Sequence, residues 1–114
     1  MVRDSIDMIC VVLVTFPSSE LATTIGRALV EERLAACVNL IPAVRSIFRW
    51  QDKISDETEV LAIFKTTTAV APQLVERVTQ LHPYDVPEAL VVPVSDGLPA
   101  YLAWVASSVG EATH

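Results

Sequence analysis

The sequence is poor in the residues from which most nucleotide, metal and disulfide sites are built. Its 114 residues include only 2 His, 2 Cys and 3 Gly. Three scattered glycines exclude a P-loop or a GxGxxG turn, and neither a CxxC nor an HExxH motif occurs. Cys10 and Cys37 both lie in apolar stretches, a pattern that favours reduced thiols over a disulfide framework.

Positive charge is also scarce, with 8 Lys and Arg against 14 Asp and Glu and a formal net charge of -6. Such a surface repels a phosphate backbone, so no nucleic-acid partner is expected. The apolar run from Met8 to Phe16 is far shorter than the roughly 20 residues of a membrane span, and Asp4 and Asp7 are atypical of a signal peptide. We therefore expect no membrane partner and a cytoplasmic location.

Hydrophobic residues, by contrast, are abundant and make up 52% of the chain. At this length they suffice for one compact domain without a disulfide or a structural zinc. We expect a single domain over residues 1–114, with a core over about 8–109 and frayed ends.

The periodicity of these apolar residues predicts the order strand, helix, strand, strand, helix, strand, helix. The first run is continuously apolar and β-branched, which indicates a central strand covered on both faces. The order is that of the split βαβ arrangement of ferredoxin-like α+β domains, with the two main helices on one face of an antiparallel sheet. The predicted strands span 8–14, 37–50, 54–65 and 88–94, the hairpin turn spans 51–53, and the second and third helices span about 68–82 and 99–108.

The first helix has a clear start but two alternative ends. Ser18 or Ser19 can cap it. Its apolar stripe continues to Ala36, yet Val30 and Leu34 lie on nearly the opposite face. The helix therefore either ends earlier than the stripe or buries two sides.

The predicted hairpin is longer than the domain that carries it. At ~3.3 Å per residue, arms of about 13 residues reach roughly 43 Å, whereas a globule of this length is only about 34 Å across. A tip that carries Phe48, Trp50 and Ile54 exposes apolar area and strand edges, which proteins usually cover with another chain. We expect a homo-oligomer; the alternative is that the arms bend at Pro42 and wrap their own core.

The segment 82–88 places an imidazole, a phenol and two carboxylates within seven residues. One interpretation is a metal or small-ligand pocket, with neutral His82 as ligand and Asp85 or Glu88 as ligand or supporting partner. The other is a helix stop, in which His82 contacts the helix end and Tyr84 fills a groove.

Other polar residues allow similar pairs of interpretations. Cys10 and Cys37 can offer a thiolate to a soft metal such as Cu(I), or pack as inert thiols. Lys65 and Glu59, six residues apart, lie on one strand face, where an ion pair or an edge guard is more frequent than catalysis. Trp50 is typical of an interface anchor.

A series of short motifs runs through the chain from about residue 9 to residue 108. In order they are RLAACVN at 33–39, the Trp50 hairpin tip, Glu59, Lys65-Thr66, HPYDVPE at 82–88 and YLAW at 101–104. Together they resemble the CutA divalent-cation-tolerance family. The resemblance implies a ferredoxin-like subunit that assembles into a homotrimer through its long hairpin strands.

The resemblance also implies a non-enzymatic protein that responds to divalent metal ions and binds them, copper in particular, without needing them to fold. In copper-binding relatives the proposed ligands are a cysteine on the first strand and two adjacent histidines. Val14 and Leu81 occupy two of these positions here, so His82 is the one metal ligand that the resemblance carries over.

An alternative function is a trimeric signalling or scaffold module that binds a small molecule or a protein partner at intersubunit clefts. An enzymatic function with His82 as acid or base beside Asp85 is not expected, because no nucleophile or oxyanion donor can be placed around it. The candidates for lining a cleft are Cys37, Asn39, Trp50, Glu59, Lys65, Tyr84, Asp85 and Glu88.

Overall fold

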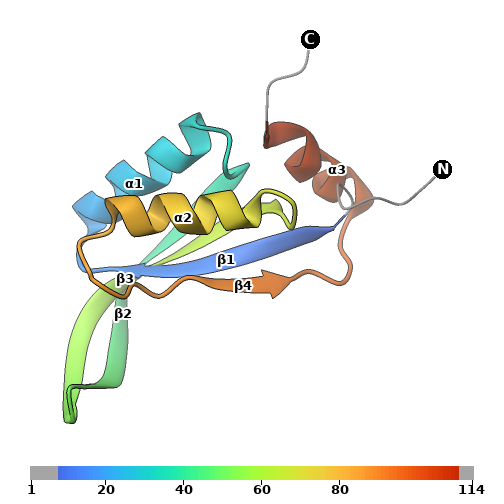
Figure 1. Cartoon of the computed structure of the whole chain (residues 1–114). Helices are drawn as coiled ribbons and strands as arrows, with labels where there is room; N and C mark the ends of the chain where they lie inside the picture. Colours follow the sequence, from blue (N-terminus) through green and yellow to red (C-terminus); the bar gives the residue numbers. More distant parts are fainter. Residues whose placement is uncertain (1–7, 111–114) are drawn as a thin grey trace.

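The structure is a computed structural model that describes residues 8–110, so the predicted frayed ends lie outside the described residues. It is an α+β fold with a four-stranded antiparallel sheet and three helices, in the predicted order (Figure 1). No helix within 8–110 is long and apolar enough to cross a membrane. The strands are β1 (Ile9–Phe16), β2 (Cys37–Trp50), β3 (Lys53–Thr67) and β4 (Leu90–Pro93), and the helices are α1 (Ser19–Glu31), α2 (Ala71–Leu81) and α3 (Pro99–Ser108).

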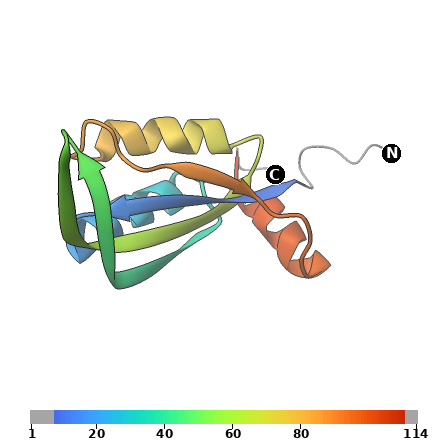
Figure 2. The same ribbon diagram turned by 90° about the horizontal axis from the view of Figure 1, so that it is seen from below.

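The sheet has the strand order β2-β3-β1-β4, and every neighbouring pair is antiparallel. Helices α1 and α2 lie side by side on one face, while α3 lies at the end of the sheet away from the hairpin (Figures 1 and 2). Alternate residues of the two central strands point toward α1 and α2 and form the core. These fully buried side chains are Cys10, Val12, Val14, Phe16, Ala62 and Phe64.

The opposite face, which α1 and α2 leave uncovered, is called the open face below. Within the single chain the helices cover only one face of β1, not both as predicted, and Val11 and Leu13 on the open face stay half-buried. Their neighbours Leu61 and Ile63 on β3 are half-buried as well, and Val92 on β4 is exposed. The chain thus presents an apolar sheet surface that its own helices do not cover.

Helix α1 ends earlier than its apolar stripe. The hydroxyl oxygen of Ser18 caps its start by accepting from the Leu21 N–H at 3.1 Å. At the other end Arg33 takes a left-handed conformation, with φ 63, and the Leu34 N–H donates to the Leu29 carbonyl at 3.0 Å. This closes the last turn in the manner of a Schellman motif. The first of the two alternatives is therefore confirmed.

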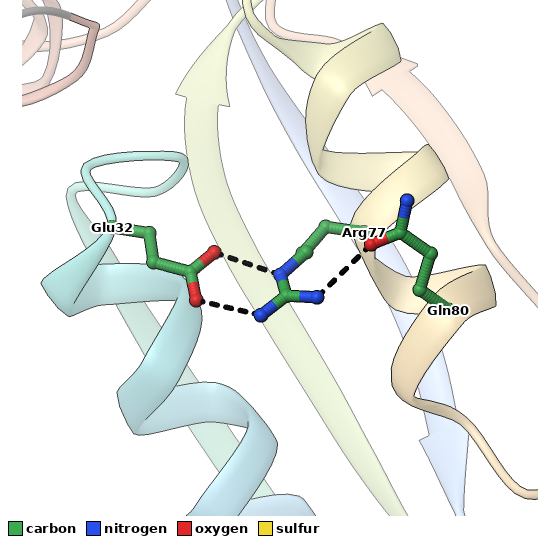
Figure 3. Close-up of polar contacts among 3 residues, drawn as sticks. All are labelled: Glu32, Arg77 and Gln80. Carbon is green, nitrogen blue, oxygen red and sulfur yellow. Dashed lines mark hydrogen bonds and ion pairs between the residues drawn. The ribbon is translucent and has the colours of Figure 1, made fainter.

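An ion pair joins the two helices on the covered face (Figure 3). The Arg77 guanidinium donates to both carboxylate oxygens of Glu32, at 2.9 and 3.1 Å, and to the side-chain oxygen of Gln80 at 3.0 Å. Hydrogen bonding to Arg77 is the main reason that the pKa of Glu32 lies below its ordinary value. This network fixes α1 against α2 far from the open face.

The β2–β3 hairpin bends and still projects beyond the domain. The register shifts between Ile41 and Val44, where Ala43 has a φ of 60, and the distal arms then turn away from the helices (Figure 1). The molecule measures 52 × 26 × 21 Å, and Ile47 and Ile54 near the tip are 64% and 63% exposed. The predicted overhang is confirmed, and the alternative that the arms wrap their own core is wrong.

Candidate functional site

His82 lies at the end of α2, where Pro83 prevents the helix from continuing. Its backbone N–H donates to the Val78 carbonyl at 2.8 Å. The ring is buried and is held at both nitrogens: Nε2 donates to the Thr15 carbonyl at 2.7 Å, and Nδ1 accepts from the Tyr84 N–H at 3.1 Å. A neutral imidazole has one donor and one acceptor nitrogen, so both are used.

Two aromatic rings complete the surroundings of His82. The Phe16 ring stacks on it with centroids 5.0 Å apart, and the Tyr84 ring lies at 4.7 Å in a tilted arrangement. The ring therefore has no free lone pair for a metal in this arrangement, and it orients the segment that carries Tyr84. This geometry corresponds to the helix-stop interpretation.

A cleft of about 700 Å³ opens beside this segment, on the open face. Its walls come from the distal hairpin, from the end of β1 and from the segment that follows His82. Apart from Ile47, the lining residues of the hairpin are every second residue of β2 and of β3, which each strand presents to the same side. The lining residues are Thr15, Ser46, Ile47, Phe48, Trp50, Ser55, Glu57, Glu59, Tyr84, Asp85, Val86 and Glu88.

One side of the cleft is acidic. The Tyr84 hydroxyl donates to a carboxylate oxygen of Glu59 at 3.0 Å, and Glu59 is only 6% exposed. Burial and this bond raise the pKa of Tyr84 to about 12. Burial, together with repulsion from Glu59, also raises the pKa of Glu88. No Lys or Arg is among the lining residues, so negative charge accumulates in the cleft without a balancing cation.

The other side of the cleft is aromatic. Phe48 and Trp50, both on β2, are 41% and 50% exposed and line the cleft together with the acidic residues. Exposed aromatic area of this kind favours contact with a flat organic group or with another chain. The cleft therefore combines two kinds of surface, and sequence patterns alone did not indicate that Phe48 would line it.

The remaining candidates gather elsewhere on the open face. The Lys65 ammonium donates to the side-chain oxygen of Asn39 and, at 3.7 Å, to the Cys37 sulfur. Tyr101, from α3, places its hydroxyl 3.4 Å from the same sulfur. Lys65 lies six residues along β3 from Glu59, roughly 20 Å at strand spacing. Lys65 and Glu59 therefore do not form an ion pair with each other.

The predicted site residues thus form two groups rather than one. Trp50, Glu59, Tyr84, Asp85 and Glu88 line the cleft, whereas Cys37, Asn39 and Lys65 lie beside α3. The Tyr101 contact escaped prediction because it joins residues 64 apart in the sequence, and no local pattern marks it.

The donor atoms do not form a ready copper site. Within residues 8–110 no group of three or more His, Cys, Asp or Glu is placed to hold a metal ion. Cys10 is fully buried on the covered face, and burial raises the pKa of its thiol. Val14, the position at which the family resemblance implies a cysteine ligand in copper-binding relatives, points to the same covered face. The cleft offers oxygen donors instead, which suit hard cations better than Cu(I).

Fold and site together define a class: an α+β domain with a long projecting hairpin and an acidic, aromatic-walled cleft on the face that its helices leave open. Residues 10–108 match the family described as "CutA1 divalent ion tolerance protein". The chain belongs to the CutA1 divalent ion tolerance family.

Individual relatives agree with this assignment. The chain is similar to the "Divalent-cation tolerance protein CutA" of Thermus thermophilus, with 52% identity over 100 residues, which are 88% of this chain and 97% of that protein. A solved structure of the Thermus protein covers 90% of this chain and 100% of its own at 51% identity, with a TM-score of 0.88. The crystal structure of CutA1 from Oryza sativa covers 96% and 100% at 35% identity, with a TM-score of 0.90.

Animal relatives are longer. "Protein CutA" of Mus musculus is 50% identical over 92 residues, which are 81% of this chain but 52% of the mouse protein. This chain therefore spans about half the length of that relative.

Proposed function

We propose that this chain is a non-enzymatic, ferredoxin-like subunit of a homotrimer that serves divalent-cation tolerance by binding a divalent cation in the acidic cleft. The observation that carries the proposal is the pair of carboxylates, Glu59 and Glu88, that repel each other in one cleft with no cationic side chain beside them. A divalent cation relieves this repulsion. Asp85, on the same wall, is a further oxygen donor.

The assembly is supported by the apolar open face. A sheet with two apolar faces normally has both of them covered by other elements. Here the open face and the projecting hairpin leave large apolar side chains in solvent, and both β2 and β4 are edge strands. A neighbouring copy covers this surface and can also complete the ligand set, since one chain supplies no group of three donors within residues 8–110.

Calorimetric titration of Mn²⁺ and of Cu²⁺ into the protein and its variants tests the cation site. We expect Glu88→Gln to weaken binding by at least about tenfold, because a lost carboxylate partner typically costs ten- to a hundredfold in metal affinity. Glu76→Gln, on the exposed side of α2, is the matched control for a lost charge and leaves binding unchanged.

The variant His82→Gln distinguishes a carboxylate site in the cleft from coordination by the His82 imidazole, which the family resemblance implies. It keeps a donor and an acceptor but removes the imidazole. Retained cation binding in His82→Gln supports the carboxylate site in the cleft. Loss of binding in His82→Gln, with Glu88→Gln unaffected, shows that the imidazole is the ligand and overturns the carboxylate site.

A second candidate function, a trimeric signalling or scaffold module, is favoured by the aromatic side of the cleft. A bare cation gains nothing from the apolar faces of Phe48 and Trp50, whereas a small organic ligand or a partner chain does. Thermal-shift screening of metabolites in the presence of a chelator tests it, since a ligand that binds only the folded state raises the melting temperature. No shift across the set counts against this function.

We also propose a cytoplasmic location, which the two free cysteines, Cys10 and Cys37, support. The solved relative from Archaeoglobus fulgidus, 35% identical, is described as periplasmic. Cell fractionation followed by immunodetection distinguishes the two compartments.

A further inference from the structure

Lys65 is a cation on the face that a neighbouring copy covers in the proposed homotrimer. It points to the open face from β3, directly opposite Cys37 on β2, and is half-buried in the single chain. Its ammonium donates to the side-chain oxygen of Asn39 and to the Cys37 sulfur at 3.7 Å, and within residues 8–110 it meets no carboxylate. Covering an ammonium with another chain is costly unless an anion pairs with it. The assembly therefore needs a carboxylate at Lys65.

The open face carries carboxylates at its other end. Glu57 and Glu59 precede Lys65 on the same side of β3 and line the cleft. The residues between them on this side, Leu61 and Ile63, are apolar and half-buried. Along β3 the open face is thus basic beside α3, apolar in the middle and acidic on the hairpin.

Glu57 is the one carboxylate of β3 that its own chain leaves without a partner. Asp56 points to the opposite face and pairs with Arg45 at 2.6 Å. Glu59 is buried and accepts from the Tyr84 hydroxyl. Glu57 is exposed and forms no ion pair in the described part of the chain. It is therefore free to pair with a cation from another copy.

The two charged ends of the open face cannot meet within one chain. Glu57 and Lys65 are roughly 26 Å apart at strand spacing. The molecule is 52 Å long, and the hairpin and α3 lie at opposite ends (Figures 1 and 2). In a cyclic trimer each interface is heterologous, so one surface of a copy meets a different surface of the next. Opposite charges at the two ends of one face provide such a pair of surfaces.

Aromatic side chains accompany both charges. Phe48 lines the cleft with Glu57 and is exposed. At the other end Tyr101 of α3 reaches the thiol beside Lys65, and its ring lies 5.5 Å from the exposed Trp104 ring. Helix α3 contains no Lys, Arg, Asp or Glu. The hairpin of one copy and the α3 end of the next are therefore complementary in apolar area as well as in charge.

From these observations we propose that the distal hairpin of one copy lies across the α3 end of the open face of the next, with Glu57 as the carboxylate that pairs with Lys65. This contact rests on the proposed homotrimer and specifies which surfaces meet in it. It leaves Glu59, Asp85 and Glu88 to the divalent cation. Each copy supplies one hairpin and one Lys65, so three such contacts close the ring and fix the direction in which the copies follow one another.

Carbodiimide cross-linking tests the contact directly, because this reagent joins a carboxylate to an amine where the two groups touch. Unlabelled and isotopically labelled protein are unfolded, mixed and reassembled before treatment. We expect an amide link between Glu57 and Lys65 that joins a light peptide to a heavy one, since the distance along β3 excludes a link within one chain. Lys65→Arg keeps the charge but offers no reactive amine, so it assembles and gives no link. A wild-type trimer without the light–heavy link overturns the contact.

Charge reversal tests whether the same pair stabilises the assembly. Lys65→Glu and Glu57→Lys each place like charges together, and each raises the concentration at which the trimer dissociates by at least about tenfold. The double variant Lys65→Glu/Glu57→Lys restores opposite charges and returns this concentration to within about threefold of wild type. Glu76→Lys, an equal change of charge on the exposed side of α2, leaves it unchanged. Sedimentation equilibrium measures the dissociation, and circular dichroism checks that each variant is folded.

Failure of this contact and failure of the homotrimer give different results. A wild type that sediments as a single chain contradicts the homotrimer and the contact with it. A wild-type trimer whose double variant dissociates as readily as the two single variants overturns the contact alone. Equal dissociation of Glu76→Lys also overturns it, because net charge rather than the Glu57–Lys65 pair then controls the assembly.

Discussion

The two faces of the sheet carry different parts of this protein. On the covered face, side chains such as Val12 and Phe64 are apolar, fully buried and packed under α1 and α2. On the open face, half-buried apolar residues lie beside Glu59, Lys65 and Cys37, whose partners are other polar side chains. Successive residues of one strand supply both surfaces. The covered face therefore holds the core of the single chain, whereas the open face presents apolar and polar side chains that the chain's own helices do not cover.

Phe64→Ala gives the largest expected effect, because it empties a fully buried position on the covered face. The free energy of unfolding falls by about 3–5 kcal/mol, from lost burial and the cavity left behind. Urea denaturation measures it, and the loss is the same at all protein concentrations because the contacts lie within one chain. A loss that varies with protein concentration contradicts the division between the faces.

Leu61→Glu changes a neighbouring position of β3 that points to the open face. Association weakens by roughly 1.5–3 kcal/mol per subunit, the contribution of burying one such side chain, and the added charge increases the effect. Light scattering coupled to size-exclusion chromatography detects the smaller species. Thr79→Glu on the exposed side of α2 is the control and leaves assembly intact; dissociation of both variants alike contradicts the interface.

Tyr84→Phe tests the contribution of the Tyr84–Glu59 hydrogen bond in the cleft. It removes the hydroxyl that donates to the buried Glu59 carboxylate, which lowers the free energy of unfolding by roughly 1–2 kcal/mol. Tyr101→Phe is the matched control, since its hydroxyl meets a half-buried thiol, and costs at most about 0.5 kcal/mol. Urea denaturation of both variants measures the difference, and equal losses count against a special role for the Tyr84–Glu59 contact.

The pH dependence contributed by Glu88 is the smallest effect. Its pKa is raised above the ordinary value of 4.5, so the folded protein holds this proton more tightly than the unfolded chain. The free energy of unfolding therefore falls as the pH rises from about 4.5 through the raised pKa. Glu88→Gln lacks this decline, whereas the control Glu76→Gln keeps it. The free energy of unfolding is measured by urea denaturation at each pH. If it varies with pH in the same way in wild type and Glu88→Gln, the raised pKa of Glu88 has no effect on stability.

Elements with local signals were predicted well from the sequence. The bounds of α3 agree with the prediction because Pro99 marks its start and its apolar spacing is regular. Ser18, one of the two predicted caps, caps the start of α1. The overhang of the hairpin followed from strand length alone, which depends only on the fixed rise per residue.

Features that rest on unusual backbone conformations were not predicted. Arg33 ends α1 in a left-handed conformation that glycine usually adopts, so the sequence carries no stop signal there. Gln51 and Asp52 form the hairpin turn with φ values of 51 and 64, although neither is Asn or Gly. Lys53 consequently belongs to β3 rather than to the predicted turn.

Five of the eight predicted cleft residues line the cleft, but the arrangement of the candidates was not predicted. Short-range proximity indicated that Tyr84, Asp85 and Glu88 belong together, and the structure places them on one wall of the cleft. The contacts of His82 with Thr15 and of Cys37 with Tyr101 span 67 and 64 residues. Such contacts depend on the packing of whole elements, which local patterns do not report.

Sedimentation equilibrium of the purified protein at micromolar concentration tests most directly whether the open face is a surface between copies of this chain. A homotrimer gives one species with three times the mass of the chain. A stable single chain over the same concentrations contradicts it, because the apolar open face and the projecting hairpin would then remain in solvent.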